Sequence, residues 1–515
     1  MKIIRSVIPG LLLAVAFSGN PLQAADQSVD WNRVHEVTVR GVNLIYDLEM
    51  ARASVVFDTV IAMAPGDPRG YFFKSMVPFW TYTLRNEEAD YERFMAMSDT
   101  VIEICERLVD QNEDDASARF FLGGIHGYRG MAEQVHGSMM KAVLEGRKGY
   151  FALEDAVHLK PDLYDAHMGF GLFRYLVAKV PSGLSWIARI AGFEGDLEGG
   201  LESLRLAATK GTYTQSEASF YLSQFLFSEH RRDQAFELMR TLIKRHPDNS
   251  LFLVLYSSWQ MREGNLDEAL AAIDKASDVN ARKAIKYGEE FIHSTRASIA
   301  YTRNDFATAR REYDHFLAKR SNRNMVPNFT FYRIAVSREL TGDRSGAIEV
   351  CKMMKEVNVA GQLNEGNLYR RGEELAARPF TPAHTALIVA GNTHGRKFYD
   401  SALVYYGQAL EKSGQDPDLR LRSLYGLQQT YYDMERDQEA VKAGEEAVVI
   451  QPLRETWVVP HVYLKLAQSY ARLGRHDDAA RALDRTEDFD DYDFQKSLER
   501  RVEEERDKLK GVAQN

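Results

Sequence analysis

The chain has 515 residues and a formal net charge of −9, and 45% of its residues are hydrophobic. This composition is ordinary for a globular protein and excludes wholesale disorder. The acidic balance argues against nucleic acid as a partner, because binding to phosphates requires a basic face.

The N-terminus, MKIIRSVIPGLLLAVAFSGNPLQAADQ, has the order of a secretory signal. Lys2 and Arg5 are basic, residues 6–17 are apolar but short for a bilayer span, and small-residue cleavage chemistry ends at Ala24. We therefore predict a signal peptide over residues 1–25 and a periplasmic or secreted mature protein. The alternative is an uncleaved membrane anchor. The two cysteines of the whole chain suit an oxidising compartment.

A repeated spacing of small and apolar residues runs through the mature chain. Ala235, Met239, Leu242 and Pro247 are one example, with residues four, seven and twelve positions after the first. The first three share a helix face, and Pro ends the unit because it cannot continue a helix. The pattern predicts the second helix of a hairpin, packed closely on the first. It also starts at Ala53, Gly149, Gly200, Ala269, Ala309, Ala347, Ala402, Ala440 and Ala479.

The spacing between neighbouring units identifies a known repeat. Ala235 and Ala269 are 34 residues apart, and later intervals reach 40 residues. The tetratricopeptide repeat (TPR) is a 34-residue helix–turn–helix unit with this small–apolar–Pro signature. The chain therefore resembles the TPR superfamily over nearly all of its mature length. The resemblance implies an all-α fold, a right-handed superhelical solenoid of about ten hairpins.

Two further helices and three regions are expected within this solenoid. The 55-residue interval from Ala347 to Ala402 predicts an extra helix, NEGNLYRRGEELAA, and the charged tail FQKSLERRVEEERDKLKG predicts a C-terminal capping helix. We expect an N-terminal TPR-like region at 26–210 with two expanded hairpins, a central solenoid at 211–360, and a C-terminal solenoid with its capping helix at 361–515.

One expanded hairpin holds an apolar, glycine-rich stretch, GFGLFRYLVAKVPSGLSWIARIAGFEGDLEGGLESL. It resembles a signature of the inclusion-body-clearance family of TPR proteins, which is found at the outer mitochondrial membrane and elsewhere. The resemblance implies a repeat adaptor without known chemistry. A secretory signal does not fit a mitochondrial location, so location is not carried over. The matching residues are Gly169, Gly171, Leu172, Phe173, Pro181, Gly192, Phe193, Gly195, Asp196, Gly200 and Leu201.

The apolar insertion at 176–193 has two interpretations. Leu184 and Ile187 share a helix face, with Trp186 and Ile190 beside it. The first interpretation is a helix that folds back and fills the solenoid core. The second is an exposed patch that contacts a partner, a lipid or a membrane.

The sequence holds no HExxH, GxSxG, Walker or paired CxxC motif, so we predict no catalytic residue, metal or cofactor. Repeat solenoids usually bind through the concave surface formed by their first helices. Aromatic and amide side chains there suit a protein or an extended peptide. The predicted groove residues are Phe220, Gln224, Phe227, Ser258, Met261, Ser298, Tyr301, Tyr332, Tyr425, Gln429, Tyr432 and Gln468.

We therefore expect a non-catalytic scaffold of a bacterial-type cell envelope. The alternative is a lipid-handling or membrane-associated factor that uses the apolar insertion, and an enzyme is the third possibility. The Lys/Asn pattern by which some TPR proteins clamp a terminal carboxylate is missing here.

Overall fold

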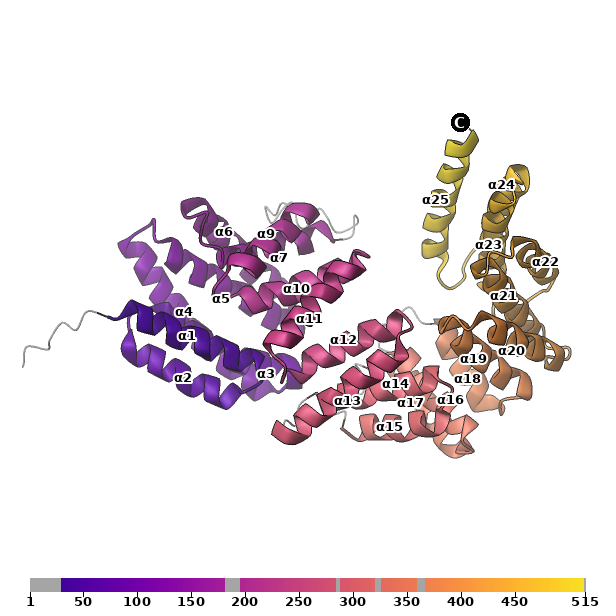
Figure 1. The fold of residues 1–515 in the computed structure, drawn as a ribbon, viewed down its shortest axis with the longest axis horizontal. Coiled ribbons are helices and arrows are strands. Elements are labelled where there is room, and N and C mark those ends of the chain that lie inside the picture. The colour runs from indigo at the N-terminus through magenta and orange to yellow at the C-terminus, as the bar shows by residue number, and fades with distance from the viewer. Residues whose placement is uncertain (1–28, 181–194, 284–287, 320–325, 359–365, 514–515) are drawn as a thin grey trace, which may run out of the picture.

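The computed structural model describes residues 29–180, 195–283, 288–319, 326–358 and 366–513. Throughout these ranges the chain forms helices and no strand. Figure 1 shows the helices following one another in chain order from one end of an elongated molecule to the other. Of the described helices, none combines the length and apolar character that a bilayer span requires.

The helices form hairpins, as the repeat spacing predicts, and each hairpin has a first and a second helix. The pairs are α1 (Trp31–Tyr46) with α2 (Met50–Met63), α3 (Pro68–Arg85) with α4 (Glu88–Gln111), α5 (Ala116–Val135) with α6 (Met139–Leu159), α7 (Ala166–Ala178) with α9 (Leu197–Lys210), α10 (Gln215–Ser228) with α11 (Arg232–Arg245), α12 (Ser250–Arg262) with α13 (Leu266–Lys283), α14 (Glu289–Thr302) with α15 (Phe306–Lys319), α16 (Asn328–Leu340) with α17 (Arg344–Asn358), α19 (Pro382–Gly395) with α20 (Tyr399–Lys412), α21 (Pro417–Asp433) with α22 (Asp437–Val448), and α23 (Val458–Arg472) with α24 (His476–Asp484). Helix α18 (Gly366–Ala377), the short η3 (Arg485–Asp488) and α25 (Gln495–Ala513) stand outside these pairs.

The repeat register read from the sequence is confirmed. The small residue that starts each pattern is buried, and the alanines among them are completely enclosed. Helix α11 ends at Arg245, two residues before Pro247, as expected where Pro cannot continue a helix. The extra helix predicted between Ala347 and Ala402 is α18.

The expanded hairpin α7/α9 depends on two glycines at its helix crossing. A Cβ atom at Gly171 would lie 2.7 Å from the carbonyl oxygen of Gly200 and 2.9 Å from the backbone nitrogen of Leu204. The two backbones are therefore closer than any side chain allows. Asp196 caps α9, because its carboxylate accepts a hydrogen bond from the Gly199 N–H at 2.9 Å.

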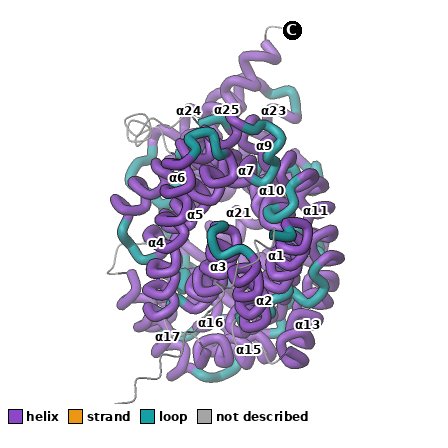
Figure 2. Tube along the Cα trace, turned by 90° about the vertical axis from the view of Figure 1, so that its left-hand side faces the viewer, coloured by secondary structure: helices purple, strands orange, loops and turns teal. Residues whose placement is uncertain are grey.

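The N-terminal part of the solenoid, α1 to α13, closes on itself and is called the N-terminal ring below. Viewed from the N-terminal side, α1, α3, α5, α7 and α10 follow one another around a circle (Figure 2). The circle is closed by the turn after α1. Asn249 Nδ2 donates to the Tyr46 carbonyl oxygen at 2.7 Å, and Lys283 Nζ donates to the Asp47 carbonyl oxygen at 3.0 Å. These contacts join residues 203 and 236 positions apart, which no repeat spacing reveals.

The far end of the solenoid is covered by α25, as the charged tail predicts. Leu498 and Val502 are buried against the last hairpin, in one hydrophobic cluster with Leu464 and Leu483. The other face of α25 is charged, which suits the terminal helix of a repeat stack.

Candidate functional site

The first helices of the N-terminal ring and the next hairpins enclose a hollow that we call the groove. It has a volume of about 400 Å³. Phe220, Gln224 and Ser258, three of the residues predicted to bind a partner, line it together. The remaining lining is mostly apolar, and its polar groups are the Asn249 amide, the Glu217 carboxyl and the hydroxyls of Tyr46 and Thr83. The other lining residues are Ile45, Leu48, Met50, Trp80, Leu84, Leu251, Phe252, Val254, Leu255 and Phe291.

Helix α10 presents three of these groups along one stripe. Glu217, Phe220 and Gln224 lie three and four positions apart, so they follow one face of the helix. Phe227 continues the stripe but is buried, with its ring stacked 4.4 Å from that of Trp259. Phe227 is therefore part of the hydrophobic core. Met261 is partly buried against a neighbouring hydrophobic cluster.

The middle of the concave surface combines tyrosines with arginines. Ser298 and Tyr301 are buried, whereas Tyr332 is half-buried. The guanidinium of Arg333 lies 5.1 Å above the Tyr301 ring, a cation–π contact. Helical spacing predicted Tyr301 and Tyr332 at this surface but gave no signal for Arg333.

Two arginines share one carboxylate beside these tyrosines. Arg371 donates to both oxygens of Glu455, at 2.6 and 3.0 Å, and Arg422 lies 3.6 Å from the same group. Burial opposes ionisation of Glu455, but Arg422 and Arg371 prevail and hold its pKa at about 2. Burial and the nearby Arg371 lower the pKa of Arg422. Glu374 also faces both arginines, and neighbouring hydrogen bonds and charges hold its pKa at about 2, so two carboxylates balance the two cations.

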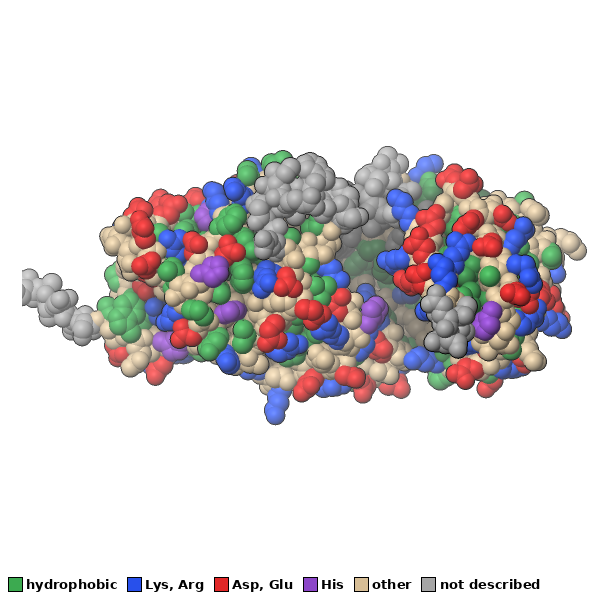
Figure 3. Space-filling view, turned by 90° about the horizontal axis from the view of Figure 1, so that it is seen from above, with side chains coloured by type: hydrophobic (Ala, Val, Ile, Leu, Met, Phe, Trp, Pro, Cys, Tyr) green, Lys and Arg blue, Asp and Glu red, His purple; other side chains and the backbone are tan. Residues whose placement is uncertain are grey.

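The C-terminal predicted residues are already in contact with other groups. Gln429 Nε2 donates to the Tyr425 hydroxyl at 2.8 Å, and Gln468 Nε2 donates to Glu505 of α25 at 3.2 Å. Lys465 Nζ lies 3.7 Å from the centre of the Tyr432 ring. Burial lowers the pKa of Lys465 to about 8. In Figure 3 the molecule is hollowed between the N-terminal ring and these C-terminal hairpins.

Glu217 is a functional candidate that the sequence analysis missed. Its side chain is buried inside the N-terminal ring, where the hydroxyls of Tyr128 and Tyr46 donate to Oε2 at 2.6 and 3.1 Å. Within the described part of the chain, no hydrogen-bond partner reaches Oε1. Burial raises the pKa of Glu217 to about 7, against the opposing effect of the two tyrosine hydrogen bonds. The three residues come from distant hairpins, so sequence spacing gives no signal for this cluster.

Two further predictions concern residues outside the described ranges. One is the signal peptide at 1–25. The other is the set of candidate membrane or partner contacts Leu184, Trp186, Ile187 and Ile190.

The fold and the repeat register place the chain in a known class. The Iml2/Tetratricopeptide repeat protein 39 family model matches residues 165–321, which include the glycine-rich signature, and a tetratricopeptide repeat model matches residues 460–485. The chain is a tetratricopeptide repeat superfamily protein that resembles the Iml2/Tetratricopeptide repeat protein 39 family. No curated protein matches it in sequence.

Several solved structures are similar to the chain. A TPR protein from Parabacteroides merdae has 16% identity and a TM-score of 0.27, covering 56% of this chain and 98% of its own. The APC/C hetero-tetramer Cut9–Hcn1 has 14% identity and a TM-score of 0.26, covering 88% of this chain and 86% of its own. The TPR domain of P58(IPK) has 12% identity and a TM-score of 0.22, covering 86% of this chain and 99% of its own. Because these TM-scores are low, no property of the three proteins is carried over.

Proposed function

We propose that this protein is a non-catalytic scaffold that binds an extended segment of a protein partner in its groove. TPR repeats support a protein-interaction role in general. The observation that carries the proposal is the convergence of Phe220, Gln224 and Ser258 on one hollow of about 400 Å³.

The groove lining suits the chemistry of an extended peptide. The Phe220 and Trp80 rings offer apolar area to side chains, and the Gln224 amide and Ser258 hydroxyl supply hydrogen bonds to backbone groups.

A photo-crosslinking amino acid in the groove tests the binding mode. We would place it at Gln224 and, as the matched control, at Glu237, which is exposed on the second helix α11. We expect a protein adduct from position 224 that is lost when Phe220→Ala is added, and no such adduct from position 237. Equal adducts from both positions, or none from position 224, would contradict groove binding.

We also propose that the scaffold works in the cell envelope after export. The order of basic, apolar and small residues at the N-terminus supports this location. Mass spectrometry of the protein purified from the envelope fraction should find a chain that begins after residue 24 or 25. An intact Met1 on a membrane-bound form would instead identify an N-terminal anchor.

A further inference from the structure

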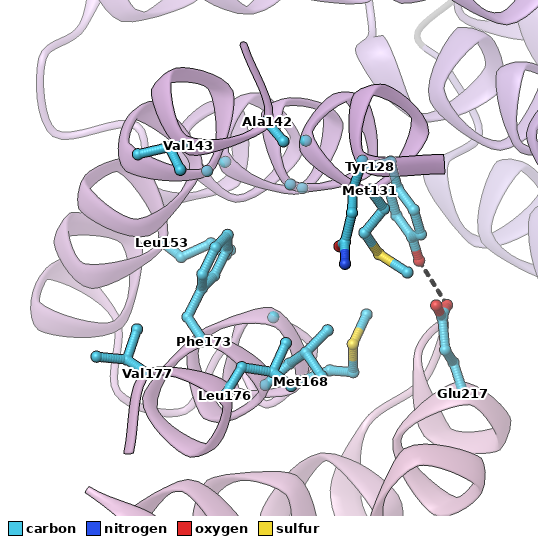
Figure 4. Close-up of a pocket in the computed structure, with 18 of the residues that line it drawn as sticks. Tyr128, Met131, Ala142, Val143, Leu153, Met168, Phe173, Leu176, Val177 and Glu217 are labelled. Atoms are coloured by element: carbon cyan, nitrogen blue, oxygen red, sulfur yellow. Dashed lines mark hydrogen bonds between the residues drawn. The ribbon is translucent and has the colours of Figure 1, made fainter. Parts of the chain in front are cut away.

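A second cavity also has Glu217 in its wall. It has a volume of about 460 Å³ and lies between α5, α6 and α7. This is within the range of small-molecule sites in proteins. Its wall is apolar and includes Met131, Met168, Leu172 and Phe173. In Figure 4, Glu217 and Tyr128 lie at one end of the cavity, and Val143 and Val177 lie at the other.

Glu217 is the charged group in the described lining of this cavity. Its side chain is 6% exposed, and Oε2 is occupied by the two tyrosine hydroxyls. Oε1 has no partner among the described residues. A buried carboxyl oxygen without a hydrogen bond is costly, so its persistence inside the ring points to a ligand group that completes it.

Two glycines keep the cavity open without being needed for helix packing. At Gly123 and Gly149 a Cβ atom would come within 2.9 Å of backbone atoms of the facing helix, so close packing of α5 and α6 requires glycine there. At Gly127 and Gly146, among the described atoms, a Cβ would approach only the Phe173 ring, at 3.6 and 3.4 Å. Alanine fits both positions and favours a helix more than glycine does. Glycine at these positions preserves space.

We infer that this cavity binds a small neutral amphiphile, with an aliphatic body between α5, α6 and α7 and a hydroxyl head on Glu217 Oε1. A hydroxyl both donates and accepts, so it pairs with the carboxyl in either protonation state. An anionic head would face the carboxylate of Glu217, and the described lining contains no Lys or Arg. The site adjoins the groove at Glu217 but does not use Phe220, Gln224 or Ser258.

Competitive displacement of an apolar dye tests this inference on the purified mature chain. The probe is N-phenyl-1-naphthylamine, whose fluorescence rises in apolar sites, and the competitors are 1-dodecanol and dodecanoate at about pH 8. We expect dodecanol to displace the dye at concentrations at least about tenfold lower than dodecanoate, because Glu217 is then ionised. Glu217→Gln should reduce this difference to within about threefold.

Cavity-filling variants locate the dye. Gly127→Leu should weaken dye binding about tenfold or more, and Gly146→Val provides a second variant from the facing helix. Glu237→Gln, exposed on α11 and in the lining of neither site, should leave dye binding unaltered. Retained dye affinity in a folded glycine variant would overturn the inference, as would equal displacement by alcohol and carboxylate in the unmodified protein. If neither glycine variant folds, the alcohol preference and its loss in Glu217→Gln decide the question.

Discussion

At the scale of single residues, Glu217 links the stability of the N-terminal ring to pH. Burial raises its pKa from the ordinary value of 4.5 to about 7, so the folded chain holds this proton more tightly than the unfolded chain does. The resulting stabilisation is complete below about pH 4.5 and is lost as the pH rises through 7. Over this interval it amounts to about 3 kcal/mol in the free energy of unfolding.

The variant Glu217→Gln should remove this pH dependence. Its amide oxygen still accepts from the Tyr128 and Tyr46 hydroxyls, but it does not titrate. Urea unfolding of both proteins between about pH 5 and pH 8 should show the wild type losing up to about 3 kcal/mol relative to the variant. Glu237→Gln, an exposed control on α11, should follow the wild type. Parallel profiles for wild type and Glu217→Gln would mean that Glu217 is ionised throughout.

At the scale of helices, the α7/α9 crossing depends on the absence of a side chain at Gly171. The methyl group of Gly171→Ala would meet the backbone of α9 at Gly200 and Leu204, so the helices must separate. We expect a loss of about 1–3 kcal/mol in the free energy of unfolding, as for an overpacked core. Gly407→Ala on α20 is the matched control, because no described atom lies within 4 Å of its added Cβ. It should raise stability by about 0.5–1 kcal/mol, through helix propensity alone.

The terminal helix α25 covers the last hairpin through a few buried side chains. Leu498 is 1% exposed, so Leu498→Ala should lower the free energy of unfolding by about 2–5 kcal/mol. Lys496→Ala, two residues earlier and exposed, should change it by less than about 0.5 kcal/mol. Chemical denaturation measures both. Similar stability for the two variants would show that α25 does not cap the solenoid.

The helices and their register were predictable because a TPR packs each hairpin mainly on its sequence neighbours. A small residue such as Ala235 marks a close helix contact wherever it recurs, and the structure buries it as expected. Contacts on the concave side were harder to predict. Phe220 and Phe227 lie on one stripe of α10, yet only Phe227 is buried, under Trp259 of the next hairpin. Helical periodicity identifies a shared face but not the neighbour that covers part of it.

At the scale of the whole molecule, the closed N-terminal ring departs from the nearest-neighbour packing of an open solenoid. Its hydrophobic core runs without a break from Val34 in α1 to Trp259 in α12. The pairing of Tyr46 with Glu217 crosses 171 positions of sequence. Both the groove and the cavity share Glu217 in their walls, so ring closure holds the two sites in one arrangement.

Asn249 allows this closure to be tested apart from helix capping. Its Oδ1 caps α12 by accepting from the Leu251 and Phe252 N–H groups, while its Nδ2 donates to the Tyr46 carbonyl oxygen across the ring. Asn249→Asp keeps the cap but replaces the donor with an oxygen, which repels the carbonyl. We expect the opening free energies of α1 and α2 to fall by about 1–3 kcal/mol, with α21 to α24 unchanged.

Hydrogen–deuterium exchange resolved by peptide measures these changes helix by helix. Asn265→Asp is the matched control, because Asn265 Nδ2 also donates a short bond, 2.8 Å to the Gln260 Oε1, but within a single hairpin turn. Its effect should stay in α12 and α13. If Asn249→Asp leaves the exchange protection of α1 and α2 unchanged, the apolar contacts alone close the ring. The polar contacts at Tyr46 and Asp47 are then a consequence of ring closure and not its cause.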